Sequence, residues 1–257
     1  MKLSPRLELI RKMIVPCECL ADIGTDHALI PAVAVREGLC SRSIATDIQA
    51  GPLERAKKTI NQYQLTARIE TCLGAGLQPI RMKNCDAFVI AGMGSMMMID
   101  MLEKDEDVAK RAKYILLQPM HAQEKLRPWL QNHGYEILSE ELAEEGKKHY
   151  QVIAVRHMEA PKDVGLPKNW LEIPCTELSG LPSDPKHTLY HRVGYGIVNR
   201  PDQYADSWIM DWIIRQQTIV EGMKRANKEK NDGFRENEVL ENLWNCYKIV
   251  HKKMNTH

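Results

Sequence analysis

The chain has 257 residues, of which 44% are hydrophobic and 27% charged, with a formal net charge of +1 at pH 7. This length predicts one domain of ordinary size with a smaller one, and the hydrophobic fraction is enough for a buried core. No apolar run approaches the roughly 18 residues that cross a membrane, and the N-terminus lacks the apolar segment of a signal peptide. We therefore expect a cytoplasmic protein, and any affinity for nucleic acid must come from local basic patches.

The first part of the chain alternates apolar runs with helical patterns. Helices are expected at 2–14, 27–37, 53–63, 96–102 and 124–132, and strands at 19–24, 43–48, 68–73, 86–92 and 114–119. This alternation predicts an α/β fold with a parallel, doubly wound sheet. Two further strands at 135–142 and 149–157 predict a β-hairpin at one edge. A parallel sheet that ends in a hairpin is typical of Rossmann-like class I methyltransferases, and less so of NAD-dependent dehydrogenases.

Composition changes between Ala160 and Pro185, where prolines and glycines break regular elements. Beyond it, apolar stripes at Ile209–Met223 and Val239–Val250 flank the turn signal Asn231-Asp232-Gly233. Two amphipathic helices with a short turn predict an antiparallel helical hairpin. We therefore expect a catalytic domain at 1–158, a junction at 159–200 and a helical hairpin domain at 201–257.

Seven cysteines are scattered along the chain. Cys17 and Cys19 are too close for ordinary zinc spacing, and no second pair completes a site. The sequence therefore predicts free thiols and no metal site.

The segment Ala21–Ala28 (Ala-Asp-Ile-Gly-Thr-Asp-His-Ala) reads as a strand, a glycine turn and the start of a helix. Gly24 lets the backbone pass close to a ligand. The dinucleotide pattern G-x-G-x-x-G is absent, which favours a cofactor with a cationic sulfonium over one with a pyrophosphate. Asp22 and Asp26 are placed to hold its ammonium group, and Asp26 alternatively caps the helix. His27 is a candidate general base, with capping or packing as the alternative.

Asp47 and Ile48 end the second expected strand, where an acidic side chain is placed to accept both hydroxyls of an adenosyl ribose. By itself this feature fits NAD as well as S-adenosylmethionine. After the third strand, the loop Gly74-Ala75-Gly76 admits an adenine ring against the backbone, or is a simple loop.

Two further candidate positions follow the fourth and fifth strands. Ala91-Gly92-Met93-Gly94 lies at the carboxyl edge of the sheet, where open α/β folds bind ligands. This places Met93 near a transferable methyl group, with ordinary packing as the alternative. The amide of Gln118 is a candidate for reading the edge of a substrate base. We therefore expect catalytic roles for Asp26, His27, Gly92, Met93, Gly94 and Gln118, and cofactor contacts from Asp22, Gly24, Asp26, His27, Asp47, Ile48, Gly74, Ala75, Gly76, Ala91 and Gly92.

The motifs at Ala21–Ala28, Ala45–Ile60, Val89–Ser95, Ile115–Met120 and Leu126–Leu142, taken together and in order, resemble the bacterial tRNA (adenine-22-N1)-methyltransferase family, TrmK. The resemblance covers roughly residues 2–157 and implies a Rossmann-like domain followed by a coiled-coil-like helical domain. Two positions depart from the family pattern. Ser95 replaces a glycine, which predicts a narrower pocket or an added hydroxyl, and Ala75 replaces Asn or Asp, which removes a side-chain bond to adenine.

The resemblance implies S-adenosylmethionine as cofactor and N1 of an adenine in tRNA, at position 22, as acceptor. N1 already carries a lone pair, so in-line positioning supplies the rate and no general base is required. A methyltransferase for another RNA or a small molecule, and an RNA-binding protein with an inactive cofactor site, are the alternatives. We expect a monomer or weak dimer. The candidate phosphate contacts, which are otherwise ordinary solvated helix faces, are Lys2, Arg6, Arg11, Lys12, Lys224, Arg225, Lys228 and Lys230.

Overall fold

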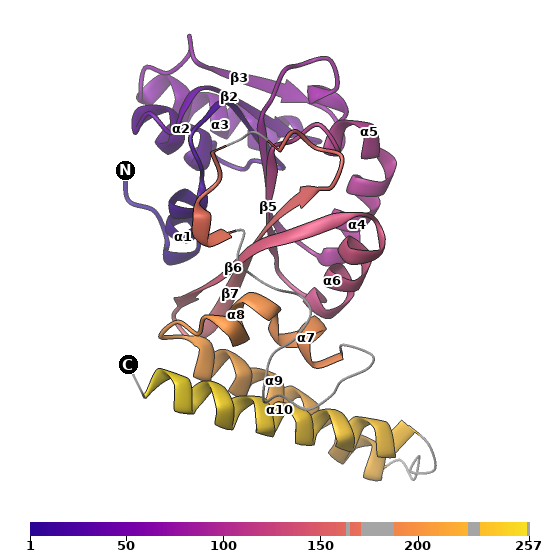
Figure 1. Ribbon diagram of the computed structural model, residues 1–257. Helices are drawn as coiled ribbons and strands as arrows, with labels where there is room; N and C mark the ends of the chain where they lie inside the picture. Colours follow the sequence, from indigo (N-terminus) through magenta and orange to yellow (C-terminus); the bar gives the residue numbers. More distant parts are fainter. Residues whose placement is uncertain (163–164, 171–187, 226–231, 256–257) are drawn as a thin grey trace. The chain divides into compact units, whose positions relative to one another are not determined.

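The computed structural model describes residues 1–162, 165–170, 188–225 and 232–255 (Figure 1). The chain divides into two compact units. The first comprises Met1–Ser139 with Ala143–Glu172, and the second comprises Glu140–Leu142 with Ile173–His257. Within the described ranges, no helix is both long and apolar enough to span a bilayer. The three functional segments expected from the sequence stay a prediction.

A seven-stranded sheet organises the first unit, in the order β3-β2-β1-β4-β5-β7-β6 (Figure 1). Strands β1 to β5 pair in parallel, and β7 pairs antiparallel with β5. This confirms the predicted parallel sheet with a hairpin at one edge. The strands are β1 (Cys17–Ile23), β2 (Cys40–Asp47), β3 (Ile69–Leu73), β4 (Ala87–Met93), β5 (Tyr114–Pro119), β6 (Tyr135–Glu145) and β7 (Lys148–His157).

Helices cover both faces of this sheet (Figure 1). On one face lie α1 (Pro5–Met13), α2 (Leu29–Arg36) and α3 (Ala50–Gln62). On the other lie the short turn η1 (Gln78–Ile80), α4 (Ser95–Lys104), α5 (Glu106–Ala109) and α6 (Gln123–Asn132). Neighbouring residues of β1 alternate between the two cores, Leu20 in the first and Ala21 in the second. Because both faces are covered, β4 and β5 are apolar over most of their length rather than alternating.

Helix α2 begins at Leu29, two residues later than its predicted start. Ala28 takes the N-cap position in the left-handed conformation, with φ 52°. Its N–H donates to Thr25 Oγ1 at 3.0 Å, so Thr25 rather than Asp26 satisfies the turn. The capping alternative for Asp26 is therefore wrong, and its side chain is available for other contacts.

Part of the segment predicted as a junction packs into the first unit. Lys168–Trp170 forms a short 3-10 turn, η2, and the Trp170 ring is buried edge-on against Tyr114 with ring centroids 5.8 Å apart. Residues 171–187, the rest of the proline-rich stretch, lie outside the described residues.

The second unit is helical and contains α7 (Thr188–Val193), α8 (Tyr195–Asn199), α9 (Ala205–Arg225) and α10 (Asp232–Met254). Helices α9 and α10 are antiparallel, because Asp206 near the start of α9 meets His251 near the end of α10 at 2.5 Å. Gln216, the one polar residue in the apolar stripe, is buried and donates to the carbonyl of Glu236. The predicted helical hairpin is thus present, and its supercoiling stays a prediction.

Candidate active site

The carboxyl ends of β1, β2 and β3 are joined by backbone hydrogen bonds. The N–H groups of Gly24 and Thr25 both donate to the Thr46 carbonyl at 2.8 Å. The Gly74 N–H donates to the Asp47 carbonyl at 2.9 Å. These bonds bring three of the sequence-predicted segments together at the sheet edge where open α/β folds bind ligands.

An apolar hollow of about 370 Å³ opens at this edge. It unites most residues predicted to contact a cofactor and adds residues from α4 and from Asp105 just after it. The predicted lining residues are Gly24, Asp47, Ile48, Gly74, Ala75, Gly76 and Met93, and the added ones include Met97, Asp100, Met101, Lys104 and Asp105.

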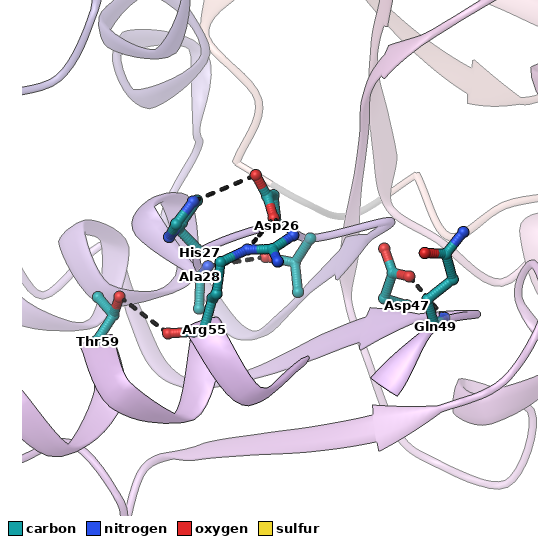
Figure 2. Close-up of polar contacts among 8 residues, drawn as sticks. Asp26, His27, Ala28, Asp47, Gln49, Arg55 and Thr59 are labelled. Carbon is teal, nitrogen blue, oxygen red and sulfur yellow. Dashed lines mark hydrogen bonds and ion pairs between the residues drawn. The ribbon is translucent and has the colours of Figure 1, made fainter. Parts of the chain in front are cut away.

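Asp47 stands at the rim of the apolar hollow with its carboxylate held in place. Its Oδ1 accepts the N–H of Gln49 at 2.7 Å (Figure 2). This short-range bond orients the side chain at the tip of β2. A carboxylate held in this way can accept hydrogen bonds from a pair of neighbouring hydroxyls.

The buried carboxylate of Asp105 supports the loop that follows β3, called the third loop below. Asp105 is 2% exposed, and its Oδ2 accepts the Leu77 N–H at 3.1 Å while its Oδ1 accepts from Arg81 at 2.8 Å. Gly76 has φ +58°, and a Cβ there would lie 3.0 Å from Asp105 Oδ2. Glycine is therefore required at this position by the carboxylate behind it as well as by the backbone conformation.

A second, polar hollow of about 320 Å³ adjoins the first and shares Gly24 with it. Among its lining residues are Arg6, Asp22, Asp26, His27 and Gly92. Burial raises the pKa of Asp22 to about 6, although the Thr25 hydroxyl and the Arg6 guanidinium oppose the shift. Loss of solvent is the largest cause, so Asp22 is a carboxylate that a bound cation would stabilise.

Met93 lines the apolar hollow and contacts Gly24, which lines both hollows. Its thioether methyl occupies the place that a Cβ on Gly24 would take, and Gly24 itself has φ +76°. Gly92, just before it, has φ +78° and interrupts the pairing of β4 with β5. The structure thus places Met93 against the glycine that the two hollows share, and its role beside a transferable methyl stays a prediction.

Asp26 and His27 line the polar hollow, and Figure 2 shows their contact with each other and that of Asp26 with Arg55. The Asp26 carboxylate accepts from Arg55 Nε at 2.8 Å and lies 3.3 Å from His27 Nε2. Both side chains are about half exposed, and Arg55 already balances the charge of Asp26. Asp22 is therefore better placed than Asp26 to hold an ammonium group, and the predicted roles of Asp26 and His27 remain untested.

Gln118 contacts the register shift of β4 at Gly92, called the Gly92 bulge below. Its Oε1 accepts the Gly92 N–H at 3.1 Å and an Arg6 N–H at 2.8 Å, while its Nε2 donates to the Pro119 carbonyl at 3.0 Å. The amide is thus engaged at both ends within the protein. Contact with a substrate base, as expected from the sequence, stays a prediction.

Ser95 does not face either hollow, which corrects the expectation that its side chain narrows the pocket. The side chain is fully buried, and its hydroxyl donates to the His121 carbonyl at 2.8 Å. The same carbonyl accepts the Ser95 N–H at 3.2 Å, and the Met120 N–H donates to the Met93 carbonyl at 2.8 Å. Ser95 therefore joins the loop after β4 to the loop after β5.

Replacing Ser95 by glycine or alanine is expected to destabilise the protein by about 1 kcal/mol, because one hydrogen bond is lost while the carbonyl keeps its backbone partner. Affinity for S-adenosylhomocysteine should stay within about twofold, since the side chain lines neither hollow. Urea denaturation and calorimetry would measure the two quantities. A large change in affinity at unchanged stability would contradict this assignment.

Ligand affinity is expected to rise between pH 5 and pH 7. Since the pKa of Asp22 in the folded protein lies above that of a free Asp, folding favours its protonated form, and this stabilisation of the fold is lost as the pH rises through about 6. A ligand ammonium needs the ionised form, so affinity should increase by up to about tenfold per pH unit below 6. Calorimetry across this pH range measures the change, and Asp22→Asn should flatten the profile because its side chain does not ionise.

Comparison with known proteins identifies the family. Residues 3–153, more than half of the chain, match the family model described as "Methyltransferase domain". The chain belongs to this family. Within the methyltransferase domain and the other described residues, no group of three or more His, Cys, Asp or Glu side chains is arranged to hold a metal ion.

One curated relative is the tRNA (adenine(22)-N(1))-methyltransferase of Bacillus subtilis (strain 168), 35% identical over 153 residues. The match covers 60% of this chain and 64% of the relative, which is less than two thirds of the relative's length. The crystal structure of the B. subtilis M1A22 tRNA methyltransferase TrmK is 25% identical, with a TM-score of 0.72 over 98% of each chain.

A putative tRNA (m1A22) methyltransferase from Streptococcus pneumoniae, solved in complex with S-adenosyl-L-methionine, has a TM-score of 0.74. It covers 96% of this chain and 100% of its own, at 23% identity. This likeness shows that the two chains share a fold that extends beyond the methyltransferase domain.

Proposed function

We propose that this chain is an S-adenosylmethionine-dependent methyltransferase that methylates N1 of adenine 22 in tRNA. The observation that carries the proposal is the pair of adjoining hollows, one apolar with Asp47 at its rim and one polar with buried Asp22, which meet at Gly24. Membership of the methyltransferase family and the 35% identical relative support the same reading.

The two hollows fit the parts of the proposed cofactor. The apolar one suits an adenine ring, and the oriented carboxylate of Asp47 in its lining supports a contact with both ribose hydroxyls. The polar one offers Asp22 to the ammonium group of the amino-acid tail. Ala75 gives the adenine pocket a methyl wall in place of a polar side chain.

When bound, S-adenosylmethionine supplies an electrophilic methyl group on a sulfonium. Adenine N1 is already a lone-pair donor, so the residues at the sheet edge have only to orient the two partners and exclude water, which is worth up to about 7–11 kcal/mol in favourable cases. Gly92 lies at the register shift of β4 and donates its N–H to Gln118. Because Gly92 has no side chain, it adds little bulk next to Met93. N1 lies on the Watson–Crick edge, so a paired target must first be opened, at a cost of about a few kcal/mol.

Recognition of tRNA also needs phosphate contacts. Of the predicted set in α1, Arg11 pairs with Glu8 and with Glu37, so its charge is largely balanced within the protein. Lys2 and Lys12 are exposed and stay candidates, as do Lys224 and Arg225 at the end of α9. Arg225 pairs with Glu221 only at 3.6 Å, and both side chains are largely exposed. Lys228 and Lys230 lie outside the described residues.

Charge reversal at Lys224 and Arg225 is expected to weaken tRNA binding and to reduce its salt dependence, because each lost phosphate contact lowers the slope of log K against log salt by about 0.7–0.9. Filter binding across a salt series would measure both. The matched control is reversal of Lys110, which pairs with Glu106 and Glu159 in the first unit. An unchanged slope for the double variant would exclude this patch.

The decisive experiment is transfer of a labelled methyl group to total tRNA, followed by nucleoside analysis. Label in 1-methyladenosine supports the proposal, and a transcript with adenine 22 replaced by guanine should then accept none. Label in another nucleoside would support the proposed cofactor and show that the acceptor is a different base. No label in any RNA, with the cofactor bound, would favour a small-molecule acceptor or an RNA-binding role without catalysis.

A further inference from the structure

Arg6 does not lie where an RNA-binding surface residue would. It is half-buried on α1 and lines the polar hollow together with Asp22 and Gly92. Its NH1 donates to Gln118 Oε1 at 2.8 Å and lies 3.6 Å from the place of a Cβ on Gly92. The sequence predicts a phosphate contact here, and the structure instead turns the side chain into the site.

Two neighbours fix the guanidinium in this position. Gln118 holds one nitrogen, and the Tyr150 ring lies beneath the group, 5.8 Å from centroid to Cζ. An arginine packed on an aromatic ring keeps its planar fork in one orientation, which suits bidentate binding of a carboxylate. The Arg6 side chain is thus ordered before any ligand arrives.

The charges of this hollow are complementary to an amino acid. Arg6 and Asp22, both in the described part of the chain, line one hollow of about 320 Å³ without an ion pair within 4 Å between them. Arg6 nevertheless lowers the pKa of Asp22, so the two charges act on each other across the hollow. A separated cation and anion are the arrangement that binds a zwitterion, whose ammonium goes to Asp22 and whose carboxylate goes to the guanidinium.

A nucleic-acid phosphate is a poorer fit to the same guanidinium. The hollow is small, and it already carries the buried carboxylate of Asp22. A phosphodiester would meet this buried acid as a like charge. The α-carboxylate of the cofactor brings its own ammonium, which offsets it.

We propose that Arg6 binds the carboxylate of the cofactor's amino-acid tail and, through Gln118, holds the Gly92 bulge in register with that tail. The inference rests on the proposed function, because it assigns one more residue to the same cofactor site. It also makes Arg6 a positioning residue, since the Gln118 oxygen that it binds also accepts the N–H of Gly92, next to Met93.

The test compares two ligands that differ only in the tail. S-adenosylhomocysteine carries the zwitterion, whereas 5′-methylthioadenosine has a methyl group in its place. Titration calorimetry on Arg6→Met should show at least about 10-fold weaker binding of S-adenosylhomocysteine, as expected for loss of a hydrogen-bonded charge. Binding of 5′-methylthioadenosine should stay within about twofold. Arg6→Lys, which keeps the charge and loses the fork, should fall between.

The matched control is Arg36→Met, since Arg36 also lies over a tyrosine ring, that of Tyr63 at 4.9 Å, and lines neither hollow. This substitution should leave the affinity for both ligands unchanged. Equal weakening of both ligands by Arg6→Met would mean that Arg6 only supports the Gly92 bulge. Unchanged ligand binding with weaker tRNA binding would make it a phosphate contact, and either result overturns the proposal.

The same titrations separate this inference from the proposed function. If the unaltered protein binds neither ligand, the cofactor assignment itself is wrong. If the unaltered protein binds both ligands and Arg6→Met binds both with unchanged affinity, only the role proposed for Arg6 is wrong.

Discussion

Asp47→Ala is expected to lower the affinity for S-adenosylhomocysteine by about 100-fold. The carboxylate is fixed at the rim of the apolar hollow by the Gln49 N–H, so its orientation is set before binding. Two hydrogen bonds from ribose hydroxyls to one carboxylate would each contribute about 1.5 kcal/mol or more, and both are lost in alanine. Titration calorimetry measures the change directly, without reference to catalysis.

The ligand pair used for Arg6 gives Asp47→Ala a distinct signature. Both S-adenosylhomocysteine and 5′-methylthioadenosine carry the ribose, so Asp47→Ala should weaken both by the same factor. Glu54→Ala is the control, because Glu54 is an exposed carboxylate on α3 that pairs with Lys57 and lines neither hollow. If Asp47→Ala retained full affinity for both ligands while folded, the ribose would have to bind elsewhere.

The sheet and the positions of the loops could be predicted because they depend on local pattern. Continuous apolar runs such as β4 and β5 can be recognised within a few residues, and parallel strands bring their carboxyl ends to one edge. This is why Gly24, Asp47 and Gly74, far apart in the chain, were expected at one site and do lie together.

What the sequence could not predict depends on tertiary contacts. Thr25 replaces Asp26 at the start of α2, because the chain passes through a left-handed residue at Ala28 that no periodicity reveals. Arg6 resembles any charged residue in an amphipathic helix until Gln118, 112 positions later, is placed beside it. Ser95 was expected in the pocket because its neighbours are there, yet its hydroxyl turns to the adjacent loop.

Asp105 is a site residue that the sequence did not predict. Its side chain supports the loop after β3, which lines the apolar hollow proposed to hold adenine. Asp105→Ala is expected to destabilise the protein by about 2–3 kcal/mol, since the buried Leu77 N–H would lose its acceptor. Leu77 directly follows Gly76, which lines the apolar hollow, so affinity for S-adenosylhomocysteine should fall as well. Urea denaturation followed by calorimetry at low temperature would separate the two effects.

Asp107→Ala provides the matched control for Asp105, because both carboxylates bind the same arginine. Asp107 is 65% exposed and contacts only the outer side of Arg81, whereas Asp105 is 2% exposed and also accepts from the backbone. Surface ion pairs contribute little, so Asp107→Ala should leave both the unfolding midpoint and ligand affinity nearly unchanged. Equal effects of the two substitutions would mean that Arg81, and not the bond to Leu77, holds the third loop in place.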